Sequence, residues 1–139
     1  MRSNHLPLKF DITSRLGAKR AVEKRILADA QKSGFDGDSL FAIRLALEEA
    51  LTNAIKHGNK FNPAKRVHVE AKVTPRQAEI IVEDEGPGFR RSAVPDPTRD
   101  ENLCKCSGRG ILLIEAFMDR VQWTRGGRRL KMVKKNEAK

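Results

Sequence analysis

The stretch LEEALTNAIKHGN, residues 47–59, decides the fold because it reads as the end of a long amphipathic helix with polar side chains on one face. Glu49 and Asn53 are four residues apart, so their Cβ atoms would lie about 5 to 6 Å apart on that face. Glu48 points about 100° away and is predicted to be a surface charge. An Asn amide oxygen suits Mg²⁺ and a nearby carboxylate suits proton abstraction, although a solvated Glu beside a helix-terminal Asn is the simpler alternative.

Working outward from this stretch, hydrophobic periodicity predicts the neighbouring elements. The long helix should begin after Asp36 or Asp38 and end near His57 and Gly58. Before it, residues 6–12 alternate like a half-buried strand, and a first helix should run from a Ser14 cap to Gly34.

After the long helix, residues 66–83 read as a β-hairpin, and residues 121–133 as a closing hairpin that turns at Gly126 and Gly127. Residues 111–119 read as a short buried helix between them. The sum is a single α+β domain over residues 1–139 with a core at about 6–134. We expect a two-layer sandwich of helices on a mixed, largely antiparallel sheet.

The segment VEDEGPGF, residues 82–89, places an acid and two glycines directly after an apolar strand. Gly86 and Gly88 can adopt positive φ and let the backbone pass close to a flat ligand. An ionised Asp84 only accepts hydrogen bonds, so it is suited to the exocyclic amine of adenine. A polar loop after a strand is the alternative.

The segment CSGRGILLIEAFMD, residues 106–119, places Ser107, Gly108, Arg109 and Gly110 before the helix expected at Ile111. Free N–H groups at a helix start attract phosphate, and Arg109 would add a charged contact. The spacing does not match the Walker-type phosphate loop. The charged, proline-containing residues 90–107 are predicted to form a lid.

Composition narrows the class of protein. Lys and Arg exceed Asp and Glu by 28 to 18, a net charge of +10, which favours polyphosphates, nucleic acid or other acidic partners. Cys104 and Cys106 are too close for an ordinary disulfide and indicate a reducing compartment. The sequence shows neither a signal peptide nor a membrane span, so we expect a cytoplasmic protein with no membrane partner.

Together, LALEEALTNAIKHGN, VEDEGPGF, DPTRDEN and SGRGILLIEAFMD resemble the Bergerat-type ATP-binding fold of DNA gyrase, Hsp90, histidine kinases and mismatch-repair ATPases. Within that superfamily the chain is most similar to the anti-sigma-factor serine kinases of the RsbW type. The resemblance implies that Glu49 is the general base and Asn53 the Mg²⁺ ligand. Residues implied to bind ATP are Asn53, Lys56, Asp84, Gly86, Gly88, Ser107, Gly108, Arg109 and Gly110.

The resemblance also implies a function. The chain would transfer the ATP γ-phosphoryl group to a Ser or Thr of an antagonist (anti-anti-sigma) protein and would sequester a sigma factor. The resemblance leaves open whether the chain forms a homodimer. The alternatives are the catalytic domain of a two-component histidine kinase, a related ATPase, or a basic nucleic-acid-binding module. No phospho-accepting His precedes the site on a dimerisation helix, and sparse aromatic residues disfavour a nucleic-acid partner.

Overall fold

The computed structural model describes residues 7–87 and 106–137. The strands are β1 (Leu8–Thr13), β2 (Arg66–Val73), β3 (Gln77–Glu83), β4 (Arg120–Thr124) and β5 (Arg129–Lys135). The α-helices are α1 (Lys19–Lys32), α2 (Gly37–Thr52) and α3 (Cys106–Phe117). Short turns of helix are η1 (Leu16–Ala18), η2 (Asn53–Gly58) and η5 (Arg125–Gly127).

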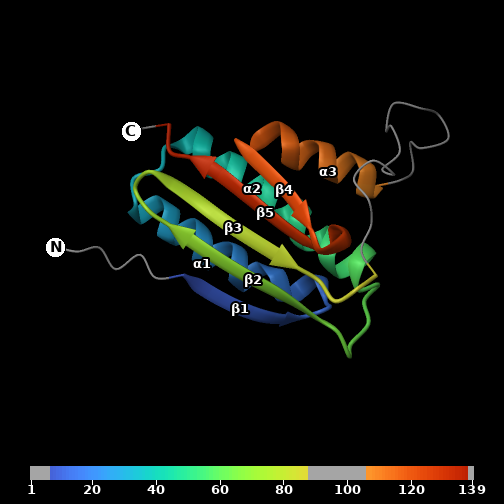
Figure 1. The fold of residues 1–139 in the computed structure, drawn as a ribbon. Coiled ribbons are helices and arrows are strands. Elements are labelled where there is room, and N and C mark those ends of the chain that lie inside the picture. The colour runs from blue at the N-terminus through green and yellow to red at the C-terminus, as the bar shows by residue number, and fades with distance from the viewer. Residues whose placement is uncertain (1–6, 88–105, 138–139) are drawn as a thin grey trace.

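The strands form one five-stranded sheet in the order β1-β2-β3-β5-β4 (Figure 1). Both predicted hairpins are present, with Val73 opposite Ala78 in one and Thr124 opposite Arg129 in the other. Every pairing in the described part of the sheet is antiparallel, so the expected mixed component is absent there.

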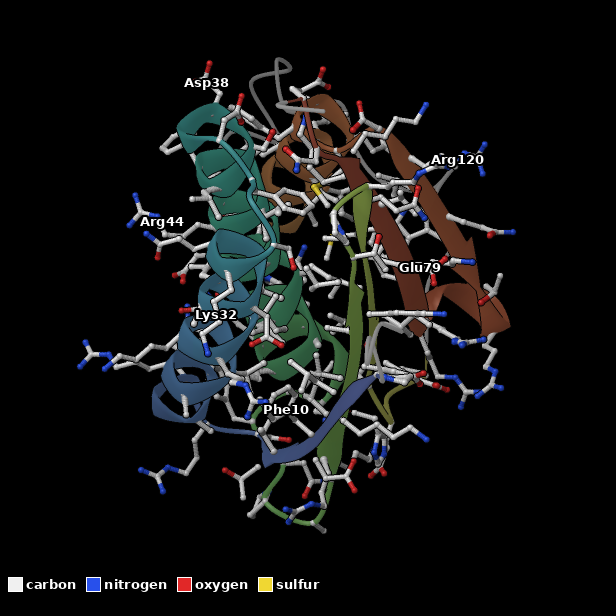
Figure 2. All side chains as sticks on the ribbon, turned by 90° about the vertical axis from the view of Figure 1, so that its left-hand side faces the viewer. Phe10, Lys32, Asp38, Arg44, Glu79 and Arg120 are labelled. Carbon is white, nitrogen blue, oxygen red and sulfur yellow. The ribbon has the colours of Figure 1, made fainter. Side chains whose placement is uncertain are left out.

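The helices cover one face of the sheet, which confirms the predicted two-layer α+β architecture (Figures 1 and 2). The core lies between the layers and contains the alternate residues Val67, Val69, Ile80 and Met132 of the sheet. The opposite face carries charges such as Glu79 and Arg120 (Figure 2). No helix among the described residues is long and apolar enough to cross a bilayer.

Two helix starts differ from the prediction. Ser14 does not cap α1, because its hydroxyl donates to the Lys65 carbonyl at 2.6 Å and holds distant segments together. Helix α3 begins at Cys106 rather than Ile111. By contrast, Asp36 caps α2 as predicted and accepts the Ser39 N–H at 2.9 Å.

Candidate functional site

Glu49 and Asn53 lie together where α2 meets α3. A Cβ atom built on Gly110 of α3 would lie 2.7 Å from Glu49 Oε1 and 3.4 Å from Asn53 Nδ2. Only a residue without a side chain lets the two helices approach so closely at this point. The predicted shared face of Glu49 and Asn53 is therefore present, and it faces the beginning of α3.

Glu48 points to a different neighbour. Its carboxylate accepts a hydrogen bond from Lys19 Nζ on α1 at 2.5 Å, and its side chain is 45% exposed. Lys19 also donates to the Thr52 hydroxyl at 3.0 Å. The sequence predicted that Glu48 is a surface charge. In the structure it does more than that, because it ties α2 to α1 on the side away from Gly110.

Helix α2 continues into a π-helical turn, η2 (Asn53–Gly58), which brings the helix end against the loop after β3. A Cβ atom on Gly58 would lie 2.3 Å from Asp84 Oδ2, and one on Gly86 would lie 2.0 Å from the Gly58 carbonyl oxygen. Gly86 is not among the positive-φ glycines, so the reason for glycine here is close approach and not left-handed backbone. Single π turns inside helices are frequent at functional sites.

Asp84 is the half-buried acid of this contact. Its Oδ1 accepts the Gly86 N–H at 2.8 Å, while its own N–H donates to the Arg128 carbonyl at 3.1 Å. Burial raises the pKa of Asp84 above the usual carboxyl value, and the Gly86 hydrogen bond works against that rise. The Gly86 hydrogen bond and the close approach of Gly58 fix the position of the carboxyl group, which can accept a further hydrogen bond from a ligand.

Asn59 was not identified from the sequence, yet it organises this region. Its side chain is 1% exposed and accepts the Glu85 N–H at 2.7 Å. The same amide donates to Ser14 Oγ and to the Arg66 carbonyl, both at 3.0 Å. Gly58, identified only as a helix end, is the other residue missed. The one signal in the sequence for Gly58 and Asn59 was that a small residue and a polar residue stand next to each other where the amphipathic helix pattern stops.

The beginning of α3 differs from the prediction that Ser107, Gly108, Arg109 and Gly110 form a loop before the helix. These residues form the first turns of α3 itself, which starts at Cys106. The first backbone N–H groups of a helix lack intrahelical partners, so the expected anion-binding feature remains, shifted toward the N-terminus. Gly88 and residues 90–105 of the expected lid lie outside the described residues.

The donor set fits a magnesium ion that also binds phosphates. Among the described residues no group hydrogen-bonds to the buried Asn53 Nδ2, and a half-turn of the amide would present Oδ1 at the same place. The described residues contain no cluster of three His, Cys, Asp or Glu side chains that could hold a metal alone. Mg²⁺ typically keeps waters and takes only one or two protein ligands beside substrate phosphates. Lys56 is exposed on η2, close to these groups in sequence.

The ends of α2 and β3 and the beginning of α3 gather at one side of the molecule (Figure 1). The family whose model matches this chain is the histidine kinase-like ATPase domain, over residues 12–134, and the chain belongs to it.

Among curated proteins, the chain is similar to the serine-protein kinase RsbW of Listeria monocytogenes, with 29% identity over 67% of this chain and 63% of that protein. It is also similar to the anti-sigma F factor of Oceanobacillus iheyensis, with 35% identity over 61% of this chain and 60% of that protein. The matched region thus spans less than two thirds of either relative.

A solved structure of the RsbU and RsbW domains of a Mycobacterium tuberculosis protein superposes with a TM-score of 0.63 at 16% identity. The superposition covers 94% of this chain and 31% of that one, and it shows a shared fold.

Proposed function

We propose that this chain is an ATP-dependent serine/threonine-protein kinase that also acts as an anti-sigma factor in the cytoplasm. It transfers the γ-phosphoryl group of ATP to a Ser or Thr of an antagonist protein, and it binds a sigma factor. The names of the relatives, serine-protein kinase RsbW and anti-sigma F factor, support this proposal.

The observation that carries the proposal is the meeting of three distant segments. Gly110 of α3 approaches Glu49 and Asn53, and Gly58 at the end of η2 approaches Asp84 after β3. One side of the sandwich therefore carries three groups: the Asp84 carboxyl group, which can contact a nucleobase, the Glu49 carboxylate with the Asn53 amide, and the beginning of α3. Nucleotide recognition needs these elements in this order: base, metal and phosphates.

In this proposal the residues divide the work. Asp84 accepts a hydrogen bond from the adenine amine, and Asn53 holds Mg²⁺, which neutralises phosphate charge when bound. Glu49 accepts the proton of the attacking hydroxyl. The hydroxyl oxygen bonds to the γ-phosphorus while the bond from that phosphorus to the β–γ bridging oxygen breaks, and ADP leaves. Positioning and charge neutralisation contribute most of the catalysis in phosphoryl transfer. The N–H groups at the beginning of α3 contact the phosphates.

The test uses proteins captured from a bacterial extract by the immobilised chain. The captured fraction is incubated with Mg²⁺ and ATP labelled on the γ-phosphate, and labelled residues are identified by mass spectrometry. We expect the wild-type chain to label one captured protein on Ser or Thr. Glu49→Gln should reduce the labelling rate by about 10² to 10⁴, whereas the matched variant Glu48→Gln should retain it. Absent labelling, or equal labelling by Glu49→Gln, would contradict the proposed kinase activity.

A further inference from the structure

Glu85 stands between Asp84 and Gly86, and it is fixed through both its backbone and its side chain. Its N–H donates to Asn59 Oδ1 at 2.7 Å, and its carboxylate contacts His68 Nε2 at 2.8 Å. The next N–H along the chain, that of Gly86, donates to the Asp84 carboxyl group at 2.8 Å. The position of Glu85 therefore helps to set the position of Asp84.

His68 contacts a carboxylate with each of its two ring nitrogens. Nδ1 lies 2.5 Å from Asp11 Oδ1 on β1, and Nε2 lies 2.8 Å from Glu85 Oε2 in the loop after β3. An ionised carboxylate only accepts hydrogen bonds, so both nitrogens must donate, and only the protonated ring has two N–H groups. These contacts therefore fit a charged His68 that joins β1 to the loop after β3.

The remaining charged groups around His68 are of mixed sign. The Glu83 carboxylate, on the residue opposite His68 in the β2–β3 pairing, binds Arg125 at 2.8 Å. Charged residues that border the same hollow of the sheet face, or act on the Glu85 carboxylate, are Lys9, Lys65, Arg66, Glu70 and Arg129. Asp11 and then Glu85 raise the pKa of His68 above its usual value, in agreement with the two contacts.

Loss of the proton weakens the contact between His68 and Glu85. The neutral ring has a single N–H group, so Nε2 either loses its hydrogen or donates without the charge that strengthens the hydrogen bond. In both cases Glu85 is held less firmly, and so is the Gly86 N–H that follows it.

We propose that His68 is a positioning residue for nucleotide binding, which in its charged form holds Glu85 and thereby keeps residues 84–86 in the arrangement that binds adenine. The inference rests on the proposed ATP-binding function. The contribution of His68 to ATP affinity should be present below pH 6.5 and should be lost as pH rises through the folded pKa. His68 and Glu85 are 43% and 40% exposed, and ion pairs of this kind contribute little, so the change in Kd should be roughly 2- to 5-fold.

The test measures ATP binding with Mg²⁺ by calorimetry at pH values that bracket 6.5 and extend well above it, with Tm recorded at each pH. The ATP phosphates titrate in part of this range, so each variant is compared with the wild type at the same pH. His68→Asn, whose amide reaches only as far as Nδ1, should bind ATP about 2- to 5-fold more weakly at the low end and like the wild type at the high end. His68→Gln can place an amide N–H where Nε2 lies, so it should recover part of the affinity without the pH dependence of the wild type.

The two carboxylates distinguish positioning from a general effect on the sheet edge. Glu85→Gln should remove the contribution of His68, so that adding His68→Asn to it changes nothing further. Asp11→Asn should keep that contribution but lose it at a lower pH than the wild type, because a carboxylate that raises the pKa of His68 is gone. Lys72→Gln is the matched control, since it removes a positive charge from the same strand and face, and it should follow the wild type.

A His68→Asn profile equal to that of the wild type, or equal effects of Asp11→Asn and Glu85→Gln, would overturn the inference. The proposed function would stand in either case, because ATP still binds. A wild-type chain that does not bind ATP would overturn both.

Discussion

Gly86→Ala tests the close approach on which the site depends. The new Cβ atom would lie 2.0 Å from the Gly58 carbonyl oxygen, about 1.4 Å short of the 3.4 Å at which ordinary contact begins. The obstacle is backbone at the end of η2, so either the loop after β3 or the helix end must move.

Forced overpacking of this kind costs roughly 1 to 3 kcal/mol of unfolding free energy, which lowers Tm by several degrees. The movement also strains the 2.8 Å hydrogen bond from the Gly86 N–H to Asp84. A hydrogen bond to a charged group contributes roughly 1.5 to 3 kcal/mol, so ATP affinity should fall by about 10-fold or more.

Thermal denaturation and ATP calorimetry measure the two effects. Gly37→Ala is the control, because a Cβ atom there would meet nothing within 4 Å, and it should change the unfolding free energy by no more than about 1 kcal/mol. If Gly86→Ala matches Gly37→Ala in both Tm and ATP affinity, the contact between η2 and the loop after β3 does not organise the site.

Three further outcomes are expected. Burial and the neighbouring Glu48 raise the pKa of Glu23 from 4.5 to about 7, so folding stability should fall as pH rises across that interval, and Glu23→Gln should flatten the fall in Tm. Asp11 and then Glu85 raise the pKa of His68 above 6.5, so the stability from its charge is present below pH 6.5 and is lost as pH rises through the folded pKa. In His68→Asn, Tm should no longer decline over this pH range. A pH dependence of Tm equal to that of the wild type would contradict the role of the His68 ion pairs. Asn53→Ala should reduce the Mg²⁺ dependence of ATP affinity, measured by calorimetry with and without chelator, and an unaltered dependence would contradict the metal assignment.

Local chemistry in the sequence predicts much of this fold. The alternation in residues 66–83 and in the closing hairpin predicts strand pairs, and their register in the sheet confirms them. Asp36 is a strong helix-capping residue next to a periodic apolar run, so the start of α2 was predictable. These features depend on neighbours only a few residues away.

The errors come from contacts between distant residues. Ser14 resembles a helix cap, but its hydroxyl hydrogen-bonds with Lys65, 51 residues away. Helix α3 was expected to start at Ile111, after two glycines, and glycine disfavours helix by about 1 kcal/mol relative to alanine. The contact of Gly110 with Glu49 lies between two helices and outweighs that local preference.

The sequence predicted which types of residue form the candidate site, but it did not predict how those residues are arranged in space. The i, i+4 spacing placed Glu49 and Asn53 on one face, and the structure places them beside Gly110. Nothing in the local sequence indicated that Gly58 would contact Asp84, or that Arg128 would continue the ladder opposite it. Those neighbours depend on how sheet and helices pack, and sequence periodicity carries no such information.

The most direct test of the site is nucleotide binding by the purified wild-type chain and by Asp84→Asn, measured by calorimetry with ATP and GTP in Mg²⁺. We expect the wild type to bind ATP in clear preference to GTP. Asp84→Asn should lose roughly 1 to 3 kcal/mol of ATP binding free energy while the fold persists. Equal binding of ATP and GTP by the wild type, or unchanged ATP affinity in a folded Asp84→Asn variant, would contradict the account.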